Sequence, residues 1–320
     1  MKGSRNELGK TVHIIPLGHE RERATFPFED RKADLIYLVV DERGLTAKRS
    51  DDMSADQVRF TDLVYNDLTE MGLTVKIVYT NTFNLATLIN TLSKLILLEQ
   101  ENKSTIFMNM SSSGRFASVA ASIAGMAHDV RLYYVHSNNF AESRNERLKH
   151  GVSICKLEES RVEEFANYRF EVPDKIELTI LEELFKKKGD GYPWATTKEL
   201  ADVLCIIDDS FDMPLFREMP KEEKEKMSEG DKTTLRNTQS RVLMRLNNSL
   251  MKRLIAKKYV ERNDPKESKV RYKITASGEY ALHLSGFGDK LEIRDYIAPN
   301  WIIEENEEKI SEAHQNSITL

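Results

Sequence analysis

The sequence predicts an α/β fold, a doubly wound and mostly parallel sheet, followed by a smaller α+β domain. Near-continuous apolar runs such as DLIYLVV at 34–40 are typical of strands that are buried on both faces of a parallel sheet. These runs alternate with helical stretches, which indicates right-handed strand–helix–strand units. After FEVPD at 170–174 the alternation stops, and helices followed by one basic β-turn take its place. The change of pattern separates two domains.

Length and composition agree with this division. A chain of 320 residues, 40% hydrophobic and 31% charged, is typical of a soluble globular protein with about two domains. No apolar run approaches the ~18 residues that a membrane helix needs, and the N-terminus MKGSRNELGK lacks an apolar signal region. We therefore expect a cytoplasmic protein without a membrane partner. Its expected parts are a sheet domain at 10–169, a linker at 170–174, a second domain at 175–285 with an insertion at 206–231, and an acidic C-terminal extension at 286–320.

The elements of the first domain follow from apolar periodicity. Helices are expected at 54–71, opened by Ser54 as N-cap and closed by Gly72, at 85–100, and at 116–128. Strands are expected at 11–17, 34–40, 74–80, 105–110, 130–136 and 152–157. Cys155 and Cys205 are far apart and lack metal-ligand spacing, so we expect buried thiols, no metal and no cofactor.

The central stretch of the first domain is a strand, a Ser-Ser-Ser-Gly-Arg turn and a helix rich in small residues, at 105–128. A helix that begins at this turn directs free N–H groups and its positive dipole end towards the loop, which favours an anion. Taken alone, an ordinary strand–helix loop explains these residues equally well.

Ligands of such sheets bind outside the carboxyl ends of the strands. That rule brings together four loops rich in hydroxyl, amide, His or Arg groups, at 18–21, 80–84, 111–115 and 137–139. None has the GxGxxG spacing of a dinucleotide site or a Walker A lysine loop, so hydride transfer and NTP hydrolysis lack their main support.

The second domain is the basic part of the chain. Helices are expected at 176–188, 196–204 and 233–257, and a strand at 270–275 follows the polar turn 263–269. Residues 232–273 contain 13 Lys and Arg against three acids, a net charge of +10 within a chain whose formal net charge is −5. This asymmetry predicts a surface that binds a polyanion.

The long helix of this domain has two different faces. Leu243, Leu246, Leu250 and Leu254 form an apolar stripe, and Thr, Arg, Asn and Lys side chains lie roughly opposite. Such a face suits the major groove, because Arg pairs with guanine and Asn with adenine. A solvated charged face is the alternative, but the acids that normally balance it are absent. The candidate DNA-binding residues are Thr234, Arg236, Thr238, Arg241, Arg245, Asn248, Lys252, Lys266, Lys269 and Arg271.

The order helix, helix, helix, basic β-turn is that of a winged helix-turn-helix. The segments SRVLMRLNNSLMKRLIAKKYVER and VRYKITASGEYAL resemble the recognition helix, the wing and the following helix of winged-helix transcription regulators. The resemblance covers 175–284, and the insertion at 206–231 departs from the usual short turn before the recognition helix.

The first domain also resembles a known family. HIIPLGHERERATFPFEDRKADLIYLV and SSSGRF, within 10–157, are similar to CARF (CRISPR-associated Rossmann) sensor domains, and more narrowly to archaeal regulators that couple a CARF domain to a winged helix. This resemblance implies a Rossmann-like domain and a homodimer, with a pocket across the two-fold axis that binds a cyclic oligoadenylate, cyclic tetra-adenylate above all. The candidate ligand-binding residues are Gly18, His19, Glu20, Asn81, Ser111, Ser112, Ser113, Gly114, Arg115 and Phe116.

The two resemblances together imply a ligand-responsive regulator that binds double-stranded DNA, with CRISPR-Cas genes as an expected target. No nucleophile–base pair is evident, so we expect no enzyme and name no catalytic residue. Two alternatives stay open. One is a ring nuclease that degrades cyclic oligoadenylate, with Glu20 as general base, and the other is a winged helix that binds proteins instead of DNA.

Overall fold

The computed structural model describes residues 9–156, 158–166, 168, 171–211, 225–264 and 269–318. The chain forms two compact units. The first unit contains the residues up to Glu171 and those from Gly286 onwards, and the second unit contains Val172–Ser285. The second unit is therefore inserted into the first, and residues 286–318 pack on the first unit.

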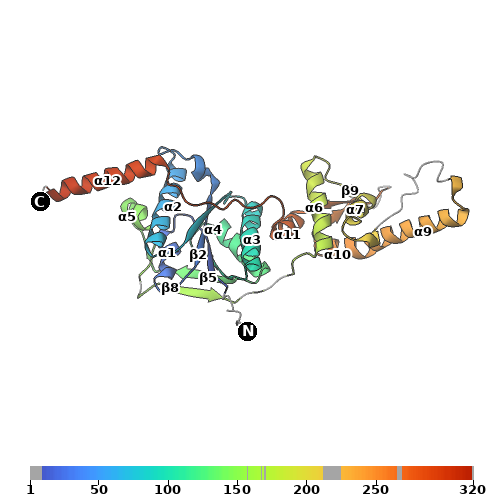
Figure 1. Cartoon of the computed structure of the whole chain (residues 1–320), viewed down its shortest axis with the longest axis horizontal. Helices are drawn as coiled ribbons and strands as arrows, with labels where there is room; N and C mark the ends of the chain where they lie inside the picture. Colours follow the sequence, from blue (N-terminus) through green and yellow to red (C-terminus); the bar gives the residue numbers. More distant parts are fainter. Residues whose placement is uncertain are drawn as a thin grey trace, which may run out of the picture. The chain divides into compact units, whose positions relative to one another are not determined.

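The first unit is built on a six-stranded Rossmann-like sheet in the order β3-β2-β1-β4-β5-β8 (Figure 1). Neighbouring strands are parallel except for β8, which is antiparallel to β5. The strands are β1 (Thr11–Pro16), β2 (Leu35–Asp41), β3 (Val75–Thr80), β4 (Thr105–Asn109), β5 (Arg131–His136) and β8 (Arg161–Phe165). The predicted class of a mostly parallel α/β sheet is confirmed.

The sixth strand is not the one expected at 152–157. That stretch forms only β7 (Ser153–Ile154), paired with β6 (Asn139–Phe140) in a separate ribbon. Its backbone N–H groups at Ser153 and Cys155 instead donate to the carboxylates of Glu20 and Glu22. The true edge strand, β8, is mostly exposed and polar, so it lacks the apolar run of a buried strand.

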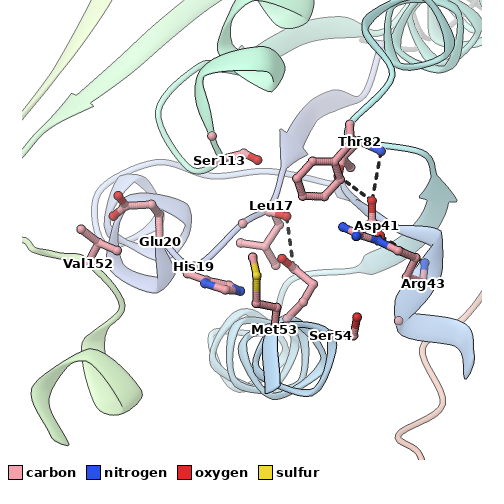
Figure 2. Close-up of a pocket in the computed structure, with 15 residues that line it drawn as sticks. Leu17, His19, Glu20, Asp41, Arg43, Met53, Ser54, Thr82, Ser113 and Val152 are labelled. Carbon is pink, nitrogen blue, oxygen red and sulfur yellow. Dashed lines mark hydrogen bonds and ion pairs between the residues drawn. The ribbon is translucent and has the colours of Figure 1, made fainter. Parts of the chain in front are cut away.

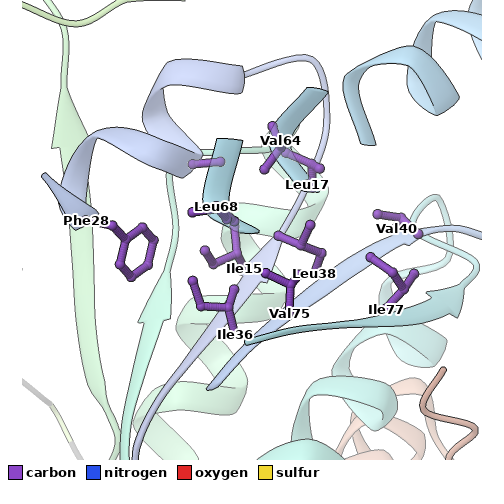
Figure 3. Packing of buried hydrophobic residues seen from close by; sticks show 11 residues of the cluster. Ile15, Leu17, Phe28, Ile36, Leu38, Val40, Val64, Leu68, Val75 and Ile77 are labelled. Carbon is purple, nitrogen blue, oxygen red and sulfur yellow. The ribbon is translucent and has the colours of Figure 1, made fainter. Parts of the chain in front are cut away.

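Helices cover both faces of this sheet. Ile36 and Leu38 pack with Val64 and Leu68 of α2 on one face (Figure 3), whereas the intervening Tyr37 donates to a carboxylate of α3 on the other face. The period of two along a strand sends alternate side chains to opposite faces. The helices of this unit are α1 (Arg21–Thr25), η1 (Phe26–Phe28), η2 (Glu42–Thr46), α2 (Asp52–Glu70), α3 (Leu85–Glu101), α4 (Arg115–Ala127), α5 (Arg144–His150) and α12 (Asn300–Ile318).

The second unit combines helices with a three-stranded antiparallel sheet in the order β10-β11-β9. Its elements in chain order are α6 (Lys175–Gly189), β9 (Ala195–Thr196), α7 (Thr197–Leu204), η3 (Asp209–Phe211), α9 (Glu229–Arg245), η4 (Leu246–Met251), α10 (Lys252–Ala256), β10 (Val260–Arg262), β11 (Arg271–Ile274) and α11 (Ala276–Leu284). Capping boxes open α6, α7 and α9. In each, the side chain before the helix accepts from the backbone N–H three residues on, and the side chain of that later residue accepts from the backbone N–H of the first.

The long helix expected at 233–257 begins earlier, at Glu229, and its middle part, η4, is a π-helix. The buried side chains are Val242, Leu246, Leu250, Met251 and Leu254, so Val242 takes the place expected of Leu243. Val242, Leu246, Leu250 and Leu254 are four residues apart, which places them on one face of the helix.

Candidate functional site

The strand order places a crevice between β1 and β4. Chain connections run outwards in opposite directions from this pair, and at such a switch point the loops after the strands separate and leave room for a ligand. A pocket of about 290 Å³ lies there (Figure 2). It is lined by Leu17, Gly18, His19, Glu20, Asp41, Arg43, Gly44, Met53, Ser54, Gln57, Thr82, Phe83, Ser113, Gly114 and Val152.

The loop after β1 supplies three residues that the sequence singled out. The N–H of Gly18 donates to the Ser112 carbonyl at 2.8 Å, and a Cβ on Gly18 would lie 3.2 Å from Ser113 Cα, so glycine lets the two loops meet. The His19 ring stacks on Phe60 with centroids 5.1 Å apart. Burial lowers the pKa of His19, although the charge of nearby Asp56 opposes the shift. A neutral imidazole therefore faces the pocket.

Glu20 is the acidic group of this loop. Its Oε2 accepts from the Ser153 N–H at 3.1 Å. Burial raises the pKa of Glu20 above the ordinary carboxyl value, and the contacts with Ser153 and Arg23 offset only part of that rise. The protonated fraction near neutral pH is thus larger than for an exposed glutamate.

Gly151 packs against the backbone of the loop after β1. Its φ is +89°, and a Cβ at this position would lie 2.4 Å from the His19 carbonyl oxygen. The same carbonyl accepts from the Val152 N–H at 3.0 Å. Only glycine satisfies both the backbone conformation and the close approach.

The loop after β4 divides its residues between pocket and interior. Ser113 and Gly114 line the pocket. Ser111 and Ser112 are only 2% and 0% exposed; the Ser111 hydroxyl donates to Asn109 and accepts from the Val135 N–H, and the Ser112 hydroxyl donates to the Pro16 carbonyl. These two serines anchor the loop to the sheet and do not line the pocket.

Arg115 and Phe116 also lie outside the lining of the pocket. They open α4 and are exposed, Phe116 by 58%. Asn81 is likewise not a lining residue, and its Oδ1 accepts from the Phe83 N–H at 3.1 Å, which shapes the turn after β3.

The loops after β2 and β3 complete the pocket with residues that the sequence analysis did not name. Asp41 is 5% exposed, and its carboxylate accepts from Arg43 Nε at 2.5 Å and from Thr82 Oγ1 at 2.7 Å. The Arg43 guanidinium lies 4.2 Å from the centroid of the Phe83 ring. Charged residues directly after a buried strand, as in VVDER, are the signal that would have indicated them.

Electrostatics keep Asp41 ionised. Burial pushes its pKa upwards, but hydrogen bonds from Arg43 and Thr82 outweigh that effect, and the pKa falls below the ordinary carboxyl value. The carboxylate therefore holds the Arg43 guanidinium in place at the rim, where 59% of the Arg43 side chain is exposed.

The candidate DNA-binding residues belong to the second unit and are mostly exposed. Arg245 is engaged within the unit: Nη1 donates to the Ser210 hydroxyl at 2.8 Å, and the guanidinium lies 4.9 Å from the centroid of the Phe211 ring. The Thr234 hydroxyl donates to the Gly230 carbonyl within α9. Thr238 is half-buried, and the exposed members are Arg236, Arg241, Asn248, Lys252, Lys269 and Arg271. Lys266 lies outside the described residues.

Neither a metal cluster nor a membrane span is found within residues 9–156, 158–166, 168, 171–211, 225–264 and 269–318. No three His, Cys, Asp or Glu side chains in them gather as metal ligands would. None of the helices in the same ranges is long and apolar enough to cross a membrane. Cys155 and Cys205 are both free thiols and half-buried, and burial raises the pKa of Cys155 to about 11.

Comparisons with known families bear on the first unit. A family model described as "HFX_2341_N:-like, N-terminal" matches residues 11–140. No curated protein matches the chain.

Several solved structures are similar at low identity. Csm6 from Enterococcus italicus, bound to cyclic hexa-2'-fluoro-hexa-dAMP, has a TM-score of 0.33 and 11% identity and covers 75% of this chain and 62% of its own. Protein VC1899 from Vibrio cholerae has a TM-score of 0.32 and 11% identity, and the match covers 86% of this chain and 64% of VC1899. Can2 from Sulfobacillus thermosulfidooxidans, in complex with cyclic tetra-adenylate, has a TM-score of 0.32 and 10% identity, and the match covers 87% of this chain and 62% of Can2. This chain thus spans 62–64% of the length of these structures. The strand order of the sheet is what defines the fold.

Proposed function

We propose that the protein is a ligand-responsive DNA-binding regulator. The first unit senses a cyclic oligoadenylate-type nucleotide in the pocket between β1 and β4, and the second unit acts as a winged helix-turn-helix. The observation that carries the proposal is the convergence of four strand-end loops on one pocket, with anion donors and an aromatic ring at its rim.

The side chains of the pocket suit a nucleotide. A guanidinium has five N–H donors, so the contact of Arg43 with Asp41 leaves donors for a phosphate. Phe83 is 61% exposed and offers a surface on which a base stacks. Ser113, beside the N-terminus of α4, adds a hydroxyl.

The size of the pocket favours a homodimer. About 290 Å³ is less than a cyclic tetranucleotide occupies, so one copy of the chain encloses only part of such a ring. A ligand with two-fold symmetry shared between two copies gives each copy the same set of contacts. Paired winged helices would then read two half-sites.

Ligand binding is tested by calorimetric titration with cyclic tetra-adenylate, with linear oligoadenylate as the control. Arg43→Ala and Arg115→Ala form a matched pair, because each removes one exposed guanidinium but only Arg43 lines the pocket. Loss of charge-assisted hydrogen bonds should weaken binding to Arg43→Ala by about tenfold or more, with Arg115→Ala near wild type. The reverse order would move the ligand to the start of α4, and absence of binding to the wild type would contradict the sensor.

The DNA-binding half of the proposal has its own support. The second unit has the element order and the three-stranded antiparallel sheet of a winged helix. Exposed basic side chains lie along α9, α10 and the β10–β11 hairpin. Binding of a labelled duplex should weaken with log salt at about −0.9 per neutralised phosphate. Arg241→Ala should reduce the slope by about one unit, whereas Lys186→Ala, which changes an exposed residue of α6, should not. A flat salt dependence would favour a protein-binding module instead.

One observation supports an additional activity of the pocket. A buried glutamate with a raised pKa is suited to general acid–base work, which supports the ring-nuclease alternative with Glu20 as the proton-transferring group. Incubation with cyclic tetra-adenylate and chromatography of the products tests it. Linear products from the wild type but not from Glu20→Gln would establish the activity, and an intact ring would leave a sensor without catalysis.

A further inference from the structure

The chain that leaves the second unit returns to the first unit. Residues 286–309, called the strap from here on, follow α11 directly and pack on the first unit. Gly286 and Gly288 have φ values of +66° and +86°, and a Cβ on Gly286 would lie 3.1 Å from Leu97 Cδ1. These glycines turn the chain tightly against α3, where Lys94 Nζ donates to the Asp289 carbonyl at 2.6 Å.

The strap next extends the central sheet at its β3 edge. Arg294 and Ile77 exchange both backbone hydrogen bonds, at 2.8 and 2.9 Å, as an isolated antiparallel bridge. Tyr296 then packs on Tyr65 of α2, with ring centroids 4.8 Å apart, and its hydroxyl donates to Asp62 at 3.2 Å. The strap is thus bound to three elements of the first unit, α3, β3 and α2, before α12 begins.

The first turns of α12 hold η2 and α2 together. The indole N–H of Trp301 donates to the carbonyl of Ala47, the residue after η2, at 3.1 Å. The carboxylate of Glu305 is 8% exposed and pairs with Arg49 at 3.1 Å and with Arg59 at 2.7 Å. A buried carboxylate shared by two guanidiniums is costly to separate from them, because neither partner can be left unpaired at low cost.

The elements held by the strap are walls of the pocket. Gly44 of η2 and Gln57 of α2 line the pocket. The same Gly44 and Gln57, with Asp41, also line a smaller cavity, and Tyr296 and Pro299 of the strap line that cavity too. The pocket and the cavity beside the strap therefore share Asp41, Gly44 and Gln57 as lining residues; Asp41 is labelled in the view of the pocket in Figure 2.

From these contacts we infer that the strap is the regulatory link between the two units. Occupancy of the pocket shifts η2 and α2, and the strap follows because it is bonded to α2 and to Ala47, directly after η2. The shift reaches the second unit through the covalent connection at 285–286. The inference rests on the proposed function for its ligand and its DNA. It requires that the ligand bind one arrangement of η2 better than the other.

The test compares four full-length proteins: the wild type, Arg294→Pro, Arg294→Ala and Trp301→Ala. Proline removes the N–H that donates to Ile77, whereas alanine keeps this donor and loses only the exposed pair with Glu292. Trp301→Ala releases η2 by a different route. Each protein is measured for thermal unfolding, for hydrogen exchange of residues 41–47, for affinity to cyclic tetra-adenylate, and for duplex affinity with and without that ligand.

Release of the strap should speed exchange at 41–47 in Arg294→Pro and Trp301→Ala, but not in Arg294→Ala. Coupled sites typically change each other's affinity about 5- to 150-fold. In Arg294→Pro and Trp301→Ala, the change in duplex affinity that the ligand causes should fall to about one-fold. The affinity for the ligand alone and the affinity for the duplex alone should each stay within about twofold of the wild type. An unchanged factor, or faster exchange confined to α12, would overturn the inference. If the wild type binds neither ligand nor duplex, the proposed function fails, and exchange at 41–47 still decides whether the strap holds the wall of the pocket.

Discussion

Asp41 shows how a single carboxylate organises the pocket. It ends β2, is almost fully buried, and joins the loop after β2 to the loop after β3 through hydrogen bonds from Arg43 and Thr82. Ordered donors that are already in place bind an anion without paying for reorganisation at that moment. Because Asp41 fixes its guanidinium, Arg43 is preorganised for the ligand contact that we propose.

The pH dependence of stability tests this role. Because the folded-state pKa of Asp41 is lowered, its contribution is present above the ordinary carboxyl value of 3.8 and is lost as pH falls through the folded value. Asp41→Asn should reduce the free energy of unfolding by about 1–3 kcal/mol at pH 7, and by less at pH ~3, as measured by denaturant titration. An equal loss at both pH values would show that the charge is not responsible.

Gly151 gives a second prediction for one residue. Gly151→Ala places a methyl group against the His19 carbonyl in addition to the strain of a positive φ. Gly72 has a similar φ of +80° with open space around it, so Gly72→Ala carries the strain alone. We expect a loss of about 1–2 kcal/mol for Gly72→Ala and a clearly larger loss for Gly151→Ala, together with weaker ligand binding. Equal melting temperatures would refute the close approach at His19.

At the scale of elements, the interrupted long helix of the second unit is the most informative. Its π segment places Asn247 inwards, where Oδ1 accepts from the Thr197 hydroxyl at 3.0 Å and from the Tyr272 hydroxyl at 2.9 Å. The helix is thereby bonded to α7 and to β11 at one point. A π segment at such a position often accompanies a functional surface.

Asn247 and Asn248 are neighbours in the chain, and we expect the first to stabilise the fold and the second to contact the duplex. Asn247→Ala leaves two hydroxyls without their acceptor and should lower the free energy of unfolding of this unit by about 1–3 kcal/mol. The control is Asn248→Ala, which changes an exposed residue and should leave stability unchanged while weakening duplex binding. Thermal melts and fluorescence anisotropy measure the two effects, and a stable Asn247→Ala protein would contradict the bonding seen at η4.

At the scale of the whole molecule, insertion of one unit into the other gives two covalent connections between them. The second unit has its own core, which includes Ile180, Leu184, Leu200 and Leu254, all at most 1% exposed. A unit with a separate core is expected to fold without its neighbour.

A fragment of residues 172–285 should therefore unfold cooperatively and bind the duplex with the same salt dependence as the full chain. It should not respond to cyclic tetra-adenylate, because the pocket belongs to the first unit. Circular dichroism measures the unfolding of the fragment, and fluorescence anisotropy measures its binding to the duplex. A fragment that stays unfolded would show that the second unit depends on the first.

The sequence alone determined those features that depend on local periodicity and on general rules of sheets. Apolar runs identified five of the six strands of the main sheet, and the parallel order brought Gly18, His19, Glu20, Ser113 and Gly114 to one edge, where they line the pocket. These features follow from residues a few positions apart, whose spacing is visible in the chain. The predicted N-cap Ser54 was wrong, because α2 begins earlier, at Asp52 after Asp51.

Only the tertiary structure decided the features that depend on distant partners. Ser111 and Ser112 turn inwards because Pro16, Asn109 and Val135 offer them hydrogen bonds, and the edge strand is β8 because the carboxylates of the β1 loop occupy the backbone of 153–155. Asp41 and Arg43 join the pocket, and the strap returns to the first unit, through pairings across the fold. Such pairings leave no period in the sequence, because the free energy that selects them comes from burial and bonding after the chain has closed on itself.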